Sequence, residues 1–208
     1  MTKYKKTPKT TIERLPVYYR TLEELKRQDV KVISSKKLGE KIGIPSTQVR
    51  KDLSYYGEFG RRGVGYEISV LLKNLKKILG LNQDWEIVAV GAGNLGRALI
   101  NYKGFKKLNL NINYVFDAND KKIGQSFGDI KINAIEEMTE IVKKNKIKIA
   151  ILAVPGKVAQ NIAEDLVEVG VKAIWNFAPV HLKLPEEVKV RNEDLSTGLI
   201  SLTYHLTR

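Results

Sequence analysis

Hydrophobic residues follow two different patterns in this 208-residue chain, and the pattern changes near residue 81. Before that point they recur every three to four residues in four stretches, which indicates amphipathic helices. Beyond it, short apolar runs alternate with helical stretches, and the runs lie at residues 85–90, 112–116, 149–154 and 171–177. Strands that alternate with helices predict a parallel sheet with helices on both faces. The sequence therefore predicts an α/β chain with a winged helix-turn-helix domain at residues 1–80 and a Rossmann-type, doubly wound domain at residues 81–190.

The N-terminal stretch has the helix start and stop signals of a helix-turn-helix. After ten polar, Lys-rich residues that we expect to form a mobile tail, a first helix starts near Pro16, because proline suits a first helical position. A serine pair at residues 34–35 can cap a short second helix, which Gly43 ends. A third helix starts near residue 46. The second helix of such a motif enters the major groove of DNA.

The segment after the third helix predicts a β-hairpin. Four glycines fall within residues 57–66, which excludes a helix interior. Arg61 and Arg62 lie on this hairpin, where a wing would reach phosphates or the minor groove. A fourth helix follows and ends at Gly80.

The outer face of the third helix carries side chains that suit DNA. Arginine pairs bidentately with guanine, and glutamine pairs with adenine. The residues that we expect to contact DNA on this helix are Thr47, Gln48, Arg50, Lys51, Ser54 and Tyr55.

Charge supports a polyanionic partner for the first domain. Residues 1–80 hold 19 basic and eight acidic side chains, an excess of 11 within a net charge of +13. Such a concentration in one domain favours nucleic-acid binding. A solvated basic surface remains the alternative on charge alone.

Residues 88–99, VAVGAGNLGRAL, contain G-x-G-x-x-G between an apolar run and a helical pattern. In this context Gly91 would make the tight turn, Gly93 would let the backbone approach a pyrophosphate, and Gly96 would let helix and strand pack closely. The start of the helix would then offer free N–H groups to the phosphates.

Asp117 ends the second apolar run, 21 residues after Gly96. A carboxylate there accepts hydrogen bonds from a ribose diol and repels a 2′-phosphate, which favours NAD(H) over NADP(H). Lys121 and Lys122 lie close by and weaken that preference slightly.

Several functions are excluded or disfavoured by composition. The chain has no cysteine and two histidines, so disulfides, thiolate catalysis and a metal cluster are not expected. No catalytic domain follows the dinucleotide domain, and we expect His181 to be structural, so binding without turnover fits better than an enzyme. The alternatives are a small NAD-dependent oxidoreductase and a nucleotide-binding subunit such as a CoA-ligase α-domain. With no long apolar run and no secretory signal, we expect a cytoplasmic protein.

Residues 191–208 repeat an apolar side chain at helical spacing. Leu195, Leu199, Leu202 and Leu206 fall at i, i+4, i+7 and i+11, and the polar residues 192–194 can cap the helix. This stripe is buried either on its own domain or on a second subunit, and the spacing leaves both outcomes open.

Five motifs occur in one order along the chain: RLPVY at residues 14–18, QVRKDLS at 48–54, RGVGY at 62–66, VGAGNLGRAL at 90–99 and WNFAP at 175–179. With these motifs the chain resembles the Rex family of bacterial redox-sensing transcriptional repressors along nearly its whole length. The resemblance implies a homodimer that pairs through its Rossmann domains and swaps the C-terminal helix at residues 191–208. It also implies binding to palindromic operator DNA when NADH is scarce, and release by NADH.

The resemblance assigns roles to particular residues. Residues 91–96, including Ala92, Asn94 and Leu95, would bind the pyrophosphate of NAD⁺ or NADH, and Asp117 the adenosine ribose. The nicotinamide end would meet Val154, Pro155, Asn176, Ala178 and Pro179. The positions whose pairing changes between states are Arg14, Tyr102 and Asp194. Leu195 stands where some relatives carry a phenylalanine that enters the partner's nicotinamide pocket.

Overall fold

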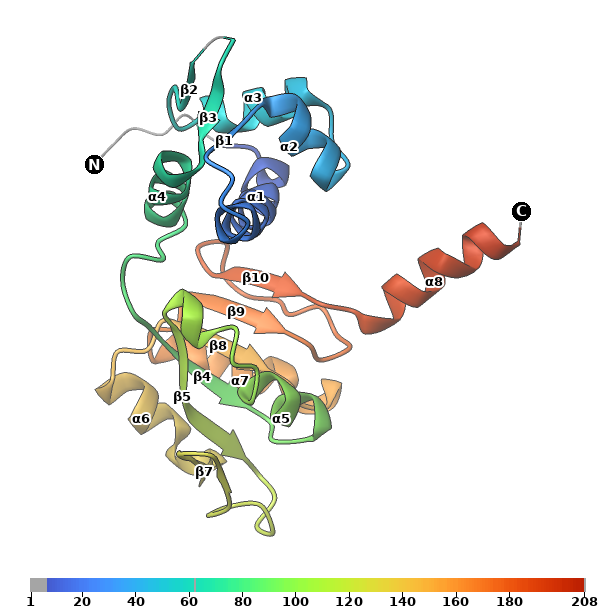
Figure 1. Ribbon diagram of the computed structural model, residues 1–208. Coiled ribbons are helices and arrows are strands. Elements are labelled where there is room, and N and C mark those ends of the chain that lie inside the picture. The colour runs from blue at the N-terminus through green and yellow to red at the C-terminus, as the bar shows by residue number, and fades with distance from the viewer. Residues whose placement is uncertain (1–6, 62, 208) are drawn as a thin grey trace. The chain divides into compact units, whose positions relative to one another are not determined.

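The computed structural model describes residues 7–61 and 63–207, and the chain divides between Gln83 and Asp84 into two compact units (Figure 1). The elements of the first unit are α1 (Lys9–Arg27), β1 (Val32–Ile33), α2 (Ser35–Ile42), α3 (Ser46–Ser54), β2 (Gly60–Arg61), β3 (Gly65–Glu67) and α4 (Ile68–Ile78).

Helix α1 begins at Lys9, so the prediction of a start near Pro16 was wrong. Pro8 precedes the helix, and Pro16 lies inside it. A proline inside a helix removes the hydrogen bond to the carbonyl four residues before it. Here Pro16 and Ile12 both lie on the exposed face, where water can solvate that carbonyl. The predicted tail is therefore helical from Lys9 onward, and its residues 1–6 lie outside the described residues.

The helix-turn-helix forms where the sequence predicts it. The Ser34 hydroxyl caps α2 by accepting a hydrogen bond from the Lys37 amide at 3.2 Å. Gly43 ends α2 in the left-handed conformation, with φ +73°. Helix α3 then starts at Ser46, and α2 lies so close to the turn that a Cβ at Gly39 would be 2.4 Å from the Ile44 carbonyl oxygen. The motif is thus built from the expected caps and one close backbone approach.

The predicted hairpin is also present. Strands β2 and β3 pair antiparallel, with Arg61 opposite Gly65, and β1 pairs with the other edge of β3. Leucines from all four helices of this unit are buried in its core: Leu15, Leu22, Leu38, Leu53, Leu71 and Leu75. The first unit is therefore a winged helix-turn-helix domain.

The second unit is a seven-stranded sheet in the order β10-β9-β8-β4-β5-β7-β6. Neighbouring strands run parallel from β10 to β7, and only β6 is antiparallel. The strands are β4 (Trp85–Val90), β5 (Leu110–Asp117), β6 (Ser126–Phe127), β7 (Ile130–Ala134), β8 (Ile149–Leu152), β9 (Ala173–Asn176) and β10 (Lys189–Asn192). The helices are α5 (Asn94–Ile100), η1 (Lys106–Leu108), η2 (Ile135–Glu137), α6 (Met138–Lys144), α7 (Gly156–Glu168) and α8 (Leu195–Leu206).

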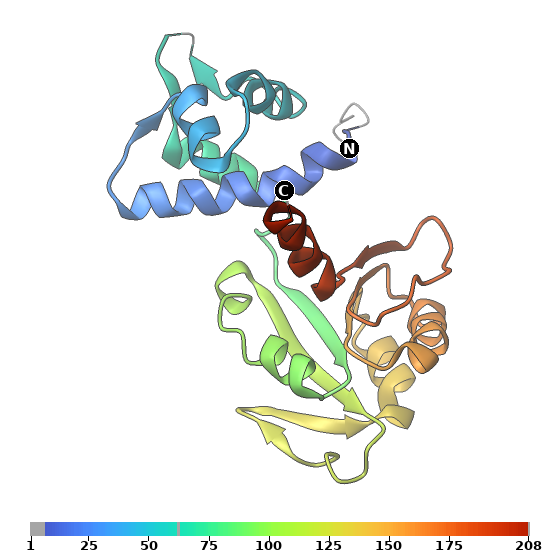
Figure 2. The same ribbon diagram turned by 90° about the vertical axis from the view of Figure 1, so that its right-hand side faces the viewer.

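Alternate residues of the central strand β4 face opposite sides of the sheet, as the two-residue period of a strand requires. Val88 and Val90 pack in a core with residues of α6 and α7. Ile87 and Ala89 pack in a second core, on the face that α5 covers. Figure 2 shows α5 on one side of the sheet and α6 and α7 on the other. The prediction of a doubly wound, Rossmann-type sheet is confirmed.

Helix α8 leaves its apolar stripe uncovered in the single chain. Asp194 caps the helix by accepting a hydrogen bond from the Ser196 amide at 2.8 Å. Leu199 is 70% exposed and Leu206 is 84% exposed. Among the described residues, this stripe is therefore not buried on the helix's own domain, which was one of the two outcomes that the sequence left open. Within the described residues, no helix combines the length and apolar character needed to cross a membrane.

Candidate functional site

A cavity of about 800 Å³ opens where β4 and β8 end. Strand β4 lies between β5 and β8 in the sheet. The connection from β4 therefore leads to one side of β4, whereas the strands from β8 onward lie on its other side. This is the topological switch point of a doubly wound sheet, where such folds bind ligands. The predicted residues that line the cavity are Gly91, Gly93, Asn94, Leu95, Asp117, Val154 and Pro155.

The glycines of the loop after β4 have three distinct surroundings. Gly91 has φ +98°, and a Cβ there would be 2.3 Å from the Ala153 carbonyl oxygen. A Cβ at Gly96 would be 1.9 Å from the Gly91 carbonyl oxygen. At Gly93 a Cβ would meet no described atom within 4 Å. The first and third glycines therefore close the turn, and the second leaves the backbone open to the cavity.

Asp117 lies at the end of β5 and is buried at the edge of the cavity. Its Oδ2 accepts hydrogen bonds from the Ala92 amide at 2.8 Å and the Lys122 ammonium at 2.9 Å. Its Oδ1 accepts one from the Asn119 amide at 2.9 Å. Burial alone would raise the pKa of Asp117, but these donors outweigh it and lower the pKa below its usual value. The carboxylate is therefore charged at neutral pH and retains acceptor capacity.

Two predicted residues of the glycine loop support the cavity instead of lining it. Ala92 is buried and orients Asp117 through its amide, and Gly96 is buried against Gly91. Sequence analysis gave no role to several further lining residues, which are Val90, Ala118, Asn119, Ile135, Ala153, Val158 and Ile162. Most are apolar residues that core packing would also explain, so the sequence carries no separate signal for them.

Asn176, Ala178 and Pro179 lie outside this cavity. The Asn176 side chain is fully buried, and its Nδ2 donates to the Val180 carbonyl at 2.8 Å and to the Asn192 side chain at 2.9 Å. Its Oδ1 accepts a hydrogen bond from the Ala178 amide at 3.0 Å. Asn176 therefore shapes the loop at residues 177–180.

That loop lines a second hollow of about 430 Å³ at the start of α8. Ala178, Pro179, His181, Asp194 and Leu195 lie on its wall. Gly156, the first residue of α7, lies close to that loop, because a Cβ there would be 2.8 Å from the Val180 side chain and 3.6 Å from Pro179. Pro155 of the cavity and Pro179 of the hollow thus lie close to the same helix start.

The exposed face of α3 holds most of the predicted DNA-binding side chains. Thr47, Lys51 and Ser54 are exposed, and the Tyr55 side chain is half-buried just beyond the helix end. Arg50 is also exposed and donates from Nη1 to the Ser35 hydroxyl at 3.0 Å. A hollow of about 560 Å³ between α3 and the hairpin brings Arg50, Ser54 and Arg61 to one surface. Arg62 lies outside the described residues.

Gln48 differs from its neighbours on α3. Its Nε2 donates to Oδ1 of Asp52 at 2.7 Å, and the Asp52 side chain is fully buried. Arg14 forms a bidentate pair with the same carboxylate, at 2.6 Å from Nε and 2.8 Å from Nη2. Burial would raise the pKa of Asp52, but hydrogen bonds from Arg14, Tyr18, Gln48 and Thr11 outweigh it and lower the pKa to about 2. Sequence analysis assigned no role to Asp52.

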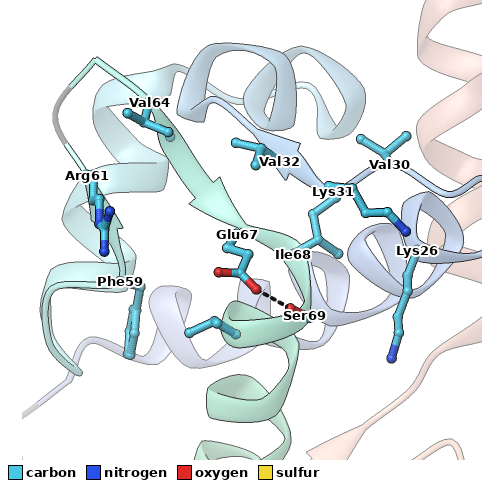
Figure 3. A pocket seen from close by; sticks show the side chains of 12 residues that line it. Lys26, Val30, Lys31, Val32, Phe59, Arg61, Val64, Glu67, Ile68 and Ser69 are labelled. Carbon is cyan, nitrogen blue, oxygen red and sulfur yellow. Dashed lines mark hydrogen bonds between the residues drawn. The ribbon is translucent and has the colours of Figure 1, made fainter.

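A separate groove of about 580 Å³ follows the outer side of the small sheet. It combines the cations Lys26, Lys31 and Arg61 with the exposed valines Val32 and Val64 (Figure 3), and Val70 also lines it. Glu67 lies in the same groove and accepts a hydrogen bond from the Ser69 hydroxyl at 2.6 Å. The groove therefore holds both cationic and acidic side chains beside exposed valines.

The three predicted switch residues each contact neighbours within their own unit. Arg14 holds Asp52. Tyr102 lies beyond the end of α5, is 58% exposed and packs edge-on against Phe105. Asp194 caps α8, and the hydrogen bonds from Ser196 lower its pKa.

A winged helix-turn-helix joined to a Rossmann-type unit defines a transcription regulator with a nucleotide-binding domain. Residues 6–54 match the family model "Putative DNA-binding protein N-terminus", and residues 82–180 match "CoA binding domain". A protein from Clostridium beijerinckii, named redox-sensing transcriptional repressor Rex, is 47% identical over 99% of this chain and 98% of its own length. The protein of the same name from Pelotomaculum thermopropionicum is 48% identical over 98% of this chain and 95% of its own length.

Solved structures of Rex-family repressors also match this chain closely. One described as RSP in complex with beta-NAD+ and operator DNA has a TM-score of 0.91 at 43% identity, over 96% of this chain and 92% of that one. Another, RSP in complex with beta-NADH, has a TM-score of 0.90 at 41% identity, over 97% of this chain and 95% of that one. The chain belongs to the Rex family of redox-sensing transcriptional repressors. Because these relatives are named repressors and match both units, the comparisons support the repressor and not the oxidoreductase alternative.

Proposed function

We propose that the protein is a homodimeric repressor that binds palindromic operator DNA when NADH is scarce and leaves it when NADH binds. The observation that carries this proposal is that one chain joins an open nucleotide cavity at a sheet switch point to an exposed recognition helix. Structures of relatives with NAD⁺ and operator DNA, and with NADH, support it. Both the operator and the pyridine nucleotides would be met in the cytoplasm, where we place the protein.

The cavity fits the adenosine diphosphate half of the dinucleotide. The open backbone at Gly93, with Gly91, Asn94 and Leu95, would receive the pyrophosphate. Ala92 and Gly96 would act by holding this loop. Asp117 would accept hydrogen bonds from the ribose diol on the acceptor site that its three donors leave and on the site that Lys122 occupies.

The nicotinamide would extend from Val154 and Pro155 toward Ala178 and Pro179, with Asn176 holding the loop in shape. NAD⁺ and NADH share adenosine contacts, so those contacts give affinity without discrimination. A ligand shifts a two-state equilibrium only through its differential affinity for the two states. Discrimination therefore falls to the nicotinamide end, which is cationic when oxidised and neutral when reduced.

The exposed stripe of α8 fits a second copy of the chain. Its four leucines form one exposed apolar face. We propose that the partner subunit covers this face, and that Arg14, Tyr102 and Asp194 change partners between the two states of the dimer.

The dimer would bind DNA through two copies of α3. Two recognition helices match successive major grooves when they lie about 34–36 Å apart. We propose that Thr47, Arg50, Lys51, Ser54, Tyr55, Arg61 and Arg62 contact DNA, and that the NADH-bound dimer loses this spacing. A 100-fold loss of operator affinity needs only about 2.7 kcal/mol of coupling.

Selection of operators from a random duplex library, with and without NADH at one stated salt concentration, tests the proposal. We expect a palindromic sequence to be enriched without NADH, and NADH to prevent its enrichment. The salt must be fixed because basic proteins bind DNA nonspecifically. Enrichment of no sequence, or equal loss with NAD⁺ and NADH, would overturn the proposal.

A further inference from the structure

The carboxylate of Asp52 joins α1 to α3. Asp52 is fully buried and accepts five hydrogen bonds from four side chains. The donors, with their distances, are Thr11 Oγ1 at 2.9 Å, Arg14 Nε at 2.6 Å and Nη2 at 2.8 Å, Tyr18 Oη at 2.7 Å and Gln48 Nε2 at 2.7 Å. We call these five residues the Asp52 cluster.

The cluster is a directional joint between two helices. Thr11, Arg14 and Tyr18 fall at i, i+3 and i+7 of α1, so they share one face of that helix. Gln48 and Asp52 fall at i and i+4 of α3. Apolar packing is non-directional, whereas hydrogen bonds weaken steeply away from their preferred angle. The cluster therefore fixes the rotation and axial position of α3 against α1 more tightly than packing alone.

Within the cluster, the Gln48 amide is directed into the protein. A carboxylate only accepts hydrogen bonds, so the atom 2.7 Å from Asp52 is the amide nitrogen. Recognition of adenine by glutamine needs both the amide nitrogen and the amide oxygen in the groove. With one N–H committed to a fully buried carboxylate, the Gln48 amide is not free to turn both atoms toward a base.

We propose that Asp52 is a positioning residue for operator recognition, which fixes α3 on α1 and holds Gln48 away from the bases. This inference rests on the proposed function, and it revises the expectation that Gln48 contacts adenine. Base recognition then belongs to the exposed side chains of α3, chiefly Thr47, Arg50 and Lys51.

The same joint reaches a proposed switch residue. Among the described residues, Arg14 contacts Asp52 through Nε and Nη2, and its side chain remains 27% exposed. A change of partner at Arg14 would act on α3 through the Asp52 cluster.

Two variants and one control test this in the full chain. Asp52→Asn keeps the side-chain shape and removes the charge, and Gln48→Ala removes one donor. Asp29→Asn is the matched control, because Asp29 is an exposed aspartate of the same unit. Each is measured for affinity to the selected operator and to a scrambled duplex, for preference at every base pair, and for hydrogen exchange of the α3 amides.

We expect Asp52→Asn to lower the ratio of operator to scrambled affinity at least about tenfold, while the scrambled affinity and its salt dependence stay as in the parent. Simple destabilisation would lower both affinities together and leave the ratio unchanged. Gln48→Ala should weaken all base preferences slightly and alike. Loss of preference at one base pair only, by about 5- to 150-fold, would show that Gln48 contacts a base. That result would overturn the proposal that Asp52 holds Gln48 away from the bases.

Hydrogen exchange decides the inference without an operator. We expect the amides of α3 to exchange faster in Asp52→Asn, while those of the second unit and of Asp29→Asn keep the parent rates. Unchanged α3 exchange would overturn the positioning role. If the parent protein selects no operator, the proposed function fails, whereas the exchange measurement still tests the joint.

Discussion

Two buried aspartates, one in each unit, are used in opposite ways. Asp52 is surrounded by side-chain donors on two helices, and its five hydrogen bonds exceed the roughly four lone-pair sites of a carboxylate. Asp117 ends a strand at the edge of a cavity and accepts three, two of them from backbone amides. A saturated carboxylate holds structure, and one with spare acceptor capacity beside a cavity can hold a ligand.

The largest effect should come from removing the saturated carboxylate. Asp52→Ala leaves Arg14 and Tyr18 without their partner inside the first unit. Breaking a buried charge pair from one side costs about 3–5 kcal/mol, so we expect a loss of that size in the free energy of unfolding. Urea unfolding measures it, with the exposed Glu40→Ala on α2 as the control. A loss below about 1 kcal/mol would mean that the cluster adds little stability.

Lowering the pH should also reduce the contribution of Asp52 to the free energy of unfolding, by less than the Asp52→Ala substitution does. The pKa of Asp52 is lowered from an ordinary 3.8 to about 2 in the folded protein. The stability that its charge contributes is complete above pH 4 and is lost as the pH falls toward 2. The pKa difference corresponds to about 2 kcal/mol. The stability gap between the parent and Asp52→Asn should therefore shrink by that amount from pH 6 to pH 2, and a constant gap would contradict it.

Removing Asp117 should reduce the affinity for nucleotide more than it reduces the stability of the fold. Asp117→Ala should weaken NADH and NAD⁺ alike, by about tenfold, since a hydrogen bond to a charged group contributes roughly 1.5–3 kcal/mol and water replaces part of it. Fluorescence titration of both nucleotides measures this, with the exposed Asp129→Ala as the control. Weakening of only one nucleotide would place Asp117 at the nicotinamide end.

The smallest effect concerns Lys122, which occupies Oδ2 of Asp117. A ribose hydroxyl that takes this lone pair must displace the ammonium. Because the Lys122 side chain is 27% exposed, its pair contributes only about 1 kcal/mol or less. Lys122→Ala should therefore bind NADH about two- to threefold more tightly, with exposed Lys121→Ala unchanged. Weaker binding by Lys122→Ala would indicate that the ammonium itself contacts the nucleotide.

The contrast between the two aspartates also separates what the sequence could predict from what it could not. Asp117 was predictable because a fixed spacing links it to the glycine loop, and β4 forms at the predicted residues 85–90. Asp52 was missed because an aspartate between Lys51 and Leu53 looks like part of a solvated helix face. Its burial depends on α1, whose first two turns escaped prediction because Pro16 was taken as a helix start. The spacing of Thr11, Arg14 and Tyr18 was the available signal.

Other parts of the fold carried weak local signals. Strand β6 has two residues, and β10 has the polar sequence Lys189–Asn192 on the sheet edge. Such strands form because their neighbours supply hydrogen bonds, which no residue pattern within them records. The predicted nicotinamide residues do not share one cavity: Val154 and Pro155 line the first, Ala178 and Pro179 line the second, and Asn176 is buried within its loop.

The central claim is that nucleotide binding in one unit is coupled to DNA binding in the other. Coupling is reciprocal, so it can be measured from either ligand. The most direct measurement compares the NADH affinity of the free protein with that of the operator-bound protein at the same salt concentration. We predict that operator DNA weakens NADH binding by the same factor by which NADH weakens operator binding, and that NAD⁺ shows a much smaller factor. Equal NADH affinity with and without operator would contradict the account.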